Sequence, residues 1–147
     1  MDSNYKKVHF GIYGIAQKDG KLLMIKKSRG PYIGLLDLPG GRMEEGELVE
    51  ETLIREIQEE TAATVKNMQF FDFAEYRCVY EENGETKYFH HIGLYFLVDI
   101  DVETLREEAD GHDSNGAEWI LLPLHENMIA PILKKPLGKL KLILSNE

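Results

Sequence analysis

The sequence predicts an α/β fold in which a mixed β-sheet lies between helices. Stretches rich in β-forming residues and helical stretches follow one another in the order β, helix, β, helix over the 147 residues. That order is typical of a mixed sheet covered by helices. Hydrophobic residues make up 43% of the chain and charged residues 29%, close to the averages of globular proteins. We therefore expect residues 1–147 to form one domain whose core needs no disulfide.

The N-terminal half is predicted to contain a hairpin, a long loop and a helix. Residues 9–27 are expected to form two strands around Asp19-Gly20, a dipeptide that favours a two-residue hairpin turn. Residues 28–46 are rich in glycine and proline, which predicts a long, shaped loop. Residues 47–61 contain neither and are rich in Glu, Leu, Ile and Arg, which predicts a helix.

The C-terminal half begins with a second and longer hairpin. Residues 67–99 are aromatic and β-branched, with a turn expected at Asn83-Gly84. Residues 101–116 are acidic and are predicted to form a loop with a short helical piece. Residues 119–122 are predicted to form a short buried strand before a proline. Residues 127–144 have a helical composition that two prolines interrupt.

The charge of the chain excludes some classes of partner. There are 26 acidic and 17 basic residues, a net charge of −9, which does not supply a basic face for a nucleic-acid polymer. A small phosphorylated ligand would need local cations or bound metal ions to overcome the field of the protein. No apolar run approaches the roughly 20 residues that span a bilayer, and the first residues do not resemble a secretory signal. With Cys78 as its single cysteine, the chain is expected in the cytoplasm, away from membranes.

The predicted helix over residues 47–61 carries carboxylates on its buried side. At 100° per residue, Glu56 and Glu60 project onto nearly the same face as Leu53 of the apolar stripe, and Glu59 lies beside them. These glutamates repel one another and oppose the helix dipole. A divalent cation would relieve both effects, since hard ions take oxygen ligands. The alternative is a solvated glutamate-rich face, which the position of these residues on the apolar side disfavours.

The spacing of these residues resembles the signature of the Nudix hydrolases. The family pattern is Gly, five residues, Glu, seven residues, Arg-Glu, an aliphatic residue, any residue and Glu-Glu. The chain matches it at Gly41, Glu47, Arg55 and the three glutamates, and Leu-Pro-Gly precedes the match. The resemblance implies a Nudix-type α/β/α sandwich that uses Mg²⁺ or Mn²⁺. It implies hydrolysis of the diphosphate linkage in a nucleoside di- or triphosphate derivative, a small-molecule substrate.

The resemblance also implies a role for each matching residue. The residues implied to bind the metal ion are Glu56, Glu59, Glu60 and, through its carbonyl oxygen, Gly40. Arg55 would orient the carboxylates through charge-assisted hydrogen bonds, and Glu47 would hold Arg55. Glu56 is our first choice for the base that takes a proton from the attacking water.

A second acidic candidate lies outside the signature. Some family members have an acid six residues before a Trp on a late strand, and here that acid is Asp113, before Trp119. It would supply a further metal ligand or the catalytic base. Glu118 and Asp110 are nearby alternatives, and the competing interpretation is that all three are solvated loop acids.

Further residues are candidates for contact with substrate. They are Lys27, Arg29, Arg42 and Tyr80. The competing interpretation places the cations in solvent and the tyrosine in the sheet core. Tyr80 stands at the distance from the signature at which diadenosine-polyphosphate hydrolases tend to have a tyrosine. His90 and His91 are adjacent on a strand, so they point to opposite faces and are interpreted as structural.

Two residues depart from the signature at its end, where Ala62 replaces a glycine and Ala63 replaces a larger aliphatic residue. Alanine in a left-handed conformation costs on the order of 1–2 kcal/mol. Either the backbone differs here or the strain is accepted, and we expect the backbone to have changed.

Three other functions stay open, as do the identity of the substrate and the choice between monomer and homodimer. The first is a non-catalytic, nucleotide-sensing module with the same fold. The second is an isomerase of prenyl diphosphates, whose nucleophile would have to be Cys78. The third is an acidic helix in a protein without a catalytic site.

Cys78 also stands where ADP-ribose enzymes tend to have a proline.

Overall fold

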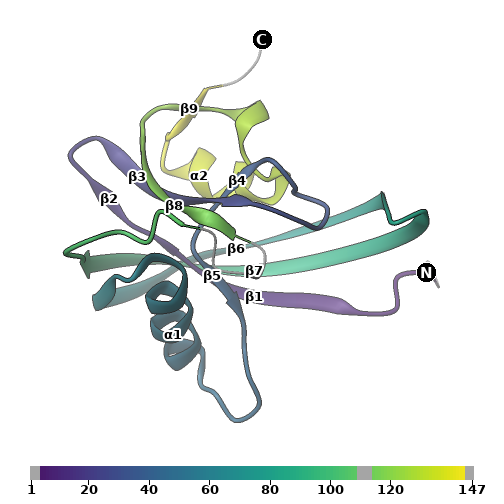
Figure 1. The fold of residues 1–147 in the computed structure, drawn as a ribbon, viewed down its shortest axis with the longest axis horizontal. Coiled ribbons are helices and arrows are strands. Elements are labelled where there is room, and N and C mark those ends of the chain that lie inside the picture. Colours follow the sequence, from purple (N-terminus) through teal and green to yellow (C-terminus); the bar gives the residue numbers. More distant parts are fainter. Residues whose placement is uncertain (1–3, 109–113, 145–147) are drawn as a thin grey trace.

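The computed structural model describes residues 4–108 and 114–144. Two four-stranded β-sheets lie between the long helix α1 on one side and the C-terminal helical turns on the other (Figure 1). The expected α/β/α sandwich is therefore confirmed, although the strands of the described residues form two four-stranded sheets and a short two-stranded one rather than a single sheet. Within the described ranges, no helix has the length and apolar character needed to cross a membrane.

The first sheet is mixed and runs through the middle of the molecule. Its strands are β1 (Val8–Ile15), β5 (Gly40–Arg42), β6 (Thr64–Glu82) and β7 (Glu85–Asp101). In the order β5-β1-β7-β6, β1 and β7 are parallel and the other neighbours are antiparallel. The turn between β6 and β7 has Asn83 at φ 52° and Gly84 at φ 78°. Positive φ at both positions suits a two-residue hairpin, so the long hairpin predicted here is confirmed.

The second sheet is antiparallel and contains only part of the first predicted hairpin, because β1, which makes up most of the expected first strand, belongs to the first sheet. Its strands are β2 (Gln17–Lys18), β3 (Lys21–Lys27), β4 (Leu36–Asp37) and β8 (Ser114–Leu121). Asp19 and Gly20 connect β2 to β3 with φ of 52° and 74°. The glycine-rich region predicted to be one loop in fact contains β4 and β5, because β3 and β1 offer these short segments partners that are distant in sequence.

The C-terminal half differs from its prediction in several places. The described residues of the acidic segment after β7 contain no helix, and β8 begins at Ser114 rather than at Trp119. The strand β8 pairs with β3 along its length, which explains its earlier start, and Leu121 at its end is exposed rather than buried. The remaining elements are β9 (Leu124–His125), η1 (Glu126–Met128), η2 (Pro131–Leu133), α2 (Lys134–Lys139) and β10 (Ile143–Leu144).

The sequence suggested one helical stretch that two prolines interrupt, whereas in the structure these prolines lie in the first turns of two different helical segments. Pro131 opens η2, and Pro136 lies in the first turn of α2, where a missing N–H costs no helical hydrogen bond. Ile132 and Leu133 in these turns are buried in one hydrophobic core, which also contains Tyr95.

The helix α1 spans Val49–Thr61, two residues later than predicted at its start. The carboxylate of Glu51 accepts a hydrogen bond from the backbone N–H of Leu48 at 2.9 Å, which satisfies one of the donors at the helix start. Leu53 and Ile57 are fully buried in a second core on this side of the sheets. This buried face continues into the C-terminal turn of α1, so Glu60 of that turn is also buried.

Ala62 ends α1 in the left-handed conformation, with φ 69° and ψ 9°. Its N–H donates to the carbonyl of Gln58 at 3.0 Å, as in a left-handed helix cap. The expectation that the backbone had changed to suit alanine was wrong. The next residue, Ala63, is fully buried, and its N–H donates to the Thr61 hydroxyl at 3.0 Å. Tertiary packing therefore sets the turn and holds alanine in a strained conformation.

Glycine at position 62 should stabilise the protein. Ala62→Gly removes a strain of about 1–2 kcal/mol, which exceeds the roughly 0.4–1 kcal/mol lost through unfolded-chain entropy. A net gain approaching 1 kcal/mol raises Tm by roughly 2–4 °C in a chain of about 150 residues. Thermal melting checks this, with Ala63→Gly as the matched control that should lower Tm. A lower Tm for Ala62→Gly would show that its cap is not strained.

Candidate active site

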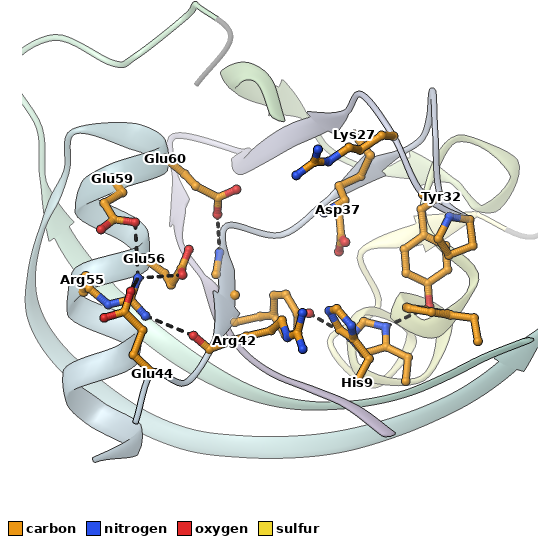
Figure 2. Close-up of a pocket in the computed structure, with 18 of the residues that line it drawn as sticks. His9, Lys27, Tyr32, Asp37, Arg42, Glu44, Arg55, Glu56, Glu59 and Glu60 are labelled. Atoms are coloured by element: carbon orange, nitrogen blue, oxygen red, sulfur yellow. Dashed lines mark hydrogen bonds and ion pairs between the residues drawn. The ribbon is translucent and has the colours of Figure 1, made fainter. Parts of the chain in front are cut away.

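A cavity of about 950 Å³ lies beside the C-terminal half of α1. Figure 2 shows its two ends: Glu56, Glu59 and Glu60 project from α1 on one side, and Tyr32 lies on the other. All four candidates for contact with substrate line it, namely Lys27, Arg29, Arg42 and Tyr80. The structure therefore places the signature glutamates in the same cavity as these three basic residues and Tyr80.

Arg55 is the centre of a hydrogen-bonded cluster of carboxylates. Its Nε and one terminal nitrogen donate to the two oxygens of Glu47 at 2.6 and 2.8 Å. Its other terminal nitrogen donates to Glu56 at 2.8 Å and to Glu59 at 3.3 Å. The hydrogen bonds with Glu47 raise the pKa of the Arg55 guanidinium, so it is permanently charged. Hydrogen bonds from Arg55 and from the backbone of Glu44 lower the pKa of Glu47 to about 2.

The adjacent glycines of β5 let the backbone approach the glutamates closely. The N–H of Gly40 donates to Glu60 at 2.7 Å, and Gly40 has a φ of 150° that side chains rarely adopt. A Cβ on Gly41 would lie 2.5 Å from the carboxylate carbon of Glu56. Any larger residue at position 41 would therefore displace the Glu56 carboxylate.

The three signature glutamates differ in their exposure. Glu60 is 4% exposed, whereas the side chains of Glu56 and Glu59 are 17% and 58% exposed. Within the described residues, no three His, Cys, Asp or Glu side chains form a ready-made metal cluster. The guanidinium of Arg55 instead contacts both Glu56 and Glu59, so an ion would share these carboxylates with Arg55.

The opposite end of the cavity is aromatic. The ring of Phe89 makes edge contacts with Tyr32 and Tyr80, at centroid distances of 5.6 and 6.3 Å. His9 lies 5.3 Å from the same ring. Such a surface can pack against a planar group. The basic residues that line the cavity are Lys27, Arg29, Arg42, Arg55 and Arg106.

The second acidic candidate is not tested by the structure. Asp113 and its alternative Asp110 lie outside the described residues. Glu118 is exposed on β8 and lines a different cavity, of about 670 Å³, so it is not brought together with Glu56.

The two histidines do point to opposite faces of β7. His90 contacts Glu75 at the surface, whereas His91 is buried and lines the cavity. The sequence predicts that adjacent strand residues face opposite sides of a sheet. Which histidine faces the cavity is determined by the pairing of β7 with β1 and β6. Sequence reasoning also missed Asp37, a buried acid of β4 in the cavity wall, because a two-residue strand in a glycine-rich region has the composition of a loop.

Comparisons with known proteins give one consistent family. The model of the NUDIX domain matches residues 5–141. An ADP-ribose pyrophosphatase of Methanocaldococcus jannaschii is 36% identical over 125 residues, covering 82% of this chain and 70% of the relative. An 8-oxo-dGTP diphosphatase of Escherichia coli is 26% identical over 138 residues, covering 92% and 98%. The crystal structure of a MutT NUDIX hydrolase from Burkholderia pseudomallei superimposes with a TM-score of 0.60 at 26% identity, covering 78% and 84%.

The contact between Glu47 and Arg55 should make stability depend on acidic pH. Folding lowers the pKa of Glu47 from 4.5 to about 2, so its contribution is complete above pH 4.5 and is lost as the pH falls toward 2. Glu47→Gln should therefore lower Tm at pH 7, and the gap to wild type should close between pH 4.5 and 2. Thermal melts across this range check it, with exposed Glu45→Gln as control. A gap that does not depend on pH would contradict the assignment.

Proposed function

This chain belongs to the NUDIX family, and from that premise we propose that it is a metal-dependent hydrolase of nucleoside diphosphate derivatives. The observation that carries the proposal is the cavity itself, in which signature carboxylates face one end and aromatic rings the other. A nucleotide has the same division, since its diphosphate is anionic and its base is planar. Basic residues in the cavity wall suit the phosphates.

The residues present fit a divalent ion. Glu56, Glu59 and Glu60 would hold Mg²⁺ or Mn²⁺, with a carbonyl oxygen from Gly40, and all of these are the hard oxygen donors that such ions prefer. The bare Cα of Gly41 leaves room for the Glu56 carboxylate itself, which a side chain at position 41 would displace. When bound, the ion neutralises a diphosphate and increases the acidity of a water molecule.

The side chains of the protein would then orient the groups that react. Glu47 holds Arg55 through two hydrogen bonds, and Arg55 in turn fixes the Glu56 carboxylate. A carboxylate held in this way, and partly shielded from solvent, suits a base that takes the proton of the water attacking phosphorus. Asp113 is the second candidate for this role. Lys27, Arg29 and Arg42 would bind phosphate oxygens, which a chain of net charge −9 would otherwise repel.

The substrate class follows from what the relatives share. The two curated relatives are named for ADP-ribose and for 8-oxo-dGTP, which both contain a nucleoside diphosphate unit. We propose that this chain acts on a molecule with that unit, and that Tyr80 and Phe89 contact its base.

Two of the competing functions are less well supported. Burial raises the pKa of the Cys78 thiol, and Cys78 is not among the described residues that line the cavity. A nucleophile for diphosphate isomerisation would need the thiolate in the site. A nucleotide-sensing module has no need of the metal-binding glutamates, whereas all three are retained here in one cavity wall.

The proposal is tested by a substrate screen with a divalent ion. ADP-ribose, 8-oxo-dGTP, nucleoside triphosphates, dinucleoside polyphosphates and NADH are incubated with Mg²⁺ or Mn²⁺ or with chelator. We expect hydrolysis to require the ion, and labelled water to leave its oxygen on a phosphate product. Glu56→Gln should lower kcat by about 10²–10⁴, whereas exposed Glu50→Gln should not. Label on carbon would refute attack at phosphorus, and unchanged kcat in Glu56→Gln would give the role of base to Asp113 or another acid.

Stability provides a test of Glu60 that does not depend on turnover. The Glu60 charge opposes the helix dipole, at a cost of roughly 0.3–1 kcal/mol, and glutamine keeps an oxygen for the Gly40 N–H. Glu60→Gln should therefore raise Tm by roughly 1–4 °C in chelator. Excess Mg²⁺ should reverse the order, because the ion stabilises the wild type by mass action.

The matched control is Glu50→Gln, at the start of the same helix, where a negative charge is favourable and its removal should lower Tm. If Glu60→Gln is less stable than wild type in chelator as well, Glu60 supports the fold and is not a metal ligand.

A further inference from the structure

We propose that His91 is a positioning residue for substrate binding. It connects the loop of residues 28–35 to β1 through hydrogen bonds. This connection fixes the position of Lys27 and Arg29, which line the cavity beside the loop, relative to the glutamates of α1. The inference rests on the proposed function for the identity of the ligand. It does not depend on that function for the bridge itself, which is a property of the folded chain.

His91 forms hydrogen bonds to two tyrosines from different parts of the chain. Its Nε2 lies 2.8 Å from the hydroxyl of Tyr13 on β1, and its Nδ1 lies 2.9 Å from the hydroxyl of Tyr32. Tyr32 belongs to the loop between β3 and β4 of the second sheet, whereas Tyr13 and His91 belong to the first. The imidazole therefore joins the two sheets at the aromatic end of the cavity, where Tyr32 lies in Figure 2.

The bridge requires a neutral imidazole with both nitrogens engaged. A neutral ring has one N–H donor and one acceptor nitrogen, and each tyrosine hydroxyl can act in either sense. Burial, with smaller contributions from His9 and Lys27, lowers the pKa of His91 to about 3, so the ring is neutral in ordinary buffers. Because both nitrogens already have partners, His91 acts on a ligand through the tyrosines rather than by direct hydrogen bonding.

Tyr32 is the one buried residue of the loop 28–35, whose other residues are exposed or half-buried. It is 3% exposed and its ring contacts Phe89, whereas its neighbour Ile33 is 64% exposed. Gly30 and Gly34 flank it with φ of 83° and 81°, and the N–H of Gly34 donates to the carbonyl of Lys27 at 2.9 Å. The turn geometry shapes the loop, and Tyr32 attaches it to the first sheet. Arg29 in the loop and Lys27, the last residue of β3 just before it, line the cavity.

Tyr13 continues the connection toward the acidic end. In the pairing of β1 with β5 it lies opposite Gly40, whose N–H donates to Glu60 at 2.7 Å. A continuous path of contacts thus runs from Glu60 through Gly40, Tyr13 and His91 to the loop. A ligand that contacts both ends of the cavity depends on this spacing, because misplacement of one group by a fraction of an ångström weakens binding.

Four variants test the bridge. His91→Leu removes both hydrogen bonds, whereas His91→Gln keeps a donor and an acceptor. Tyr32→Phe removes one hydroxyl and leaves the ring, so it serves if His91→Leu does not fold. His90→Leu is the matched control, since it lies next in sequence on the opposite face of β7 and contacts Glu75. Hydrogen exchange is measured for residues 30–35 and for α1, and KM and kcat are measured with Mg²⁺ and the substrate found in the screen.

In His91→Leu we expect exchange of residues 30–35 to accelerate about tenfold, with α1 unchanged, as loss of one or two hydrogen bonds predicts. KM should rise about tenfold while kcat changes less than about threefold, since the acidic end is intact. Tyr32→Phe should follow in the same direction, His91→Gln should return toward wild type, and His90→Leu should match wild type.

Unchanged exchange of residues 30–35 in both His91→Leu and Tyr32→Phe would overturn the inference, as would equal acceleration in α1 or a fall in kcat at constant KM. Absence of hydrolysis by the wild type in the substrate screen would instead overturn the proposed function. The exchange experiment needs no substrate, so the two failures are distinguishable.

Discussion

Three carboxylates crowd the C-terminal end of one helix, and much of the surrounding structure compensates for their charge. They repel one another, and the helix dipole is negative at that end. Arg55 supplies a cation from the same helix and contacts Glu56 and Glu59. Glu47 accepts two hydrogen bonds from the guanidinium and so holds Arg55 in place. The fixed arginine thus offsets part of the negative charge that the glutamates place at this end of the helix.

Glu60 is stabilised by a different means: its side chain is buried and accepts a hydrogen bond from the backbone of β5. This contact depends on close approach between a strand and a helix, and the two glycines at positions 40 and 41 permit it. The strand β5 is itself short and is held in place by its pairing with β1. The geometry of the acidic end therefore follows from the rigidity of the first sheet.

Local chemistry explains which parts of the fold could be predicted from the sequence. The turns at Asp19-Gly20 and Asn83-Gly84 and the helical periodicity before Ala62 are all encoded by neighbouring residues. The same periodicity predicted that the glutamates share the buried side of the helix, and the burial of Glu60 agrees with it. These features depend little on the remainder of the chain.

The features that could not be predicted depend on partners distant in sequence. The strands β4 and β5 are too short to form without β3 and β1, so their residues had only the composition of a loop. Ala62 accepts a left-handed conformation because the burial of Ala63 requires the turn. The inward position of His91, and with it the aromatic end of the cavity, follows from strand pairing that no local pattern specifies.

The segment after β7 supplies a basic residue near the C-terminal end of α1. The last turn of α1, which lies within the described residues, contains no basic residue to offset the dipole. Arg106 arrives there from a distant part of the chain: its N–H donates to the carbonyl of Thr61 at 3.0 Å, and its side chain lines the cavity. The carbonyl of Arg106 accepts a hydrogen bond from Ala117 of β8 at 2.7 Å, so the second sheet holds the segment in place. Basic groups thus reach the cavity from α1, from β5 of the first sheet, from β3 of the second sheet and from the segment after β7, although the whole chain is acidic. In the proposed function, these local cations rather than the net charge of the protein would bind the phosphates of the ligand.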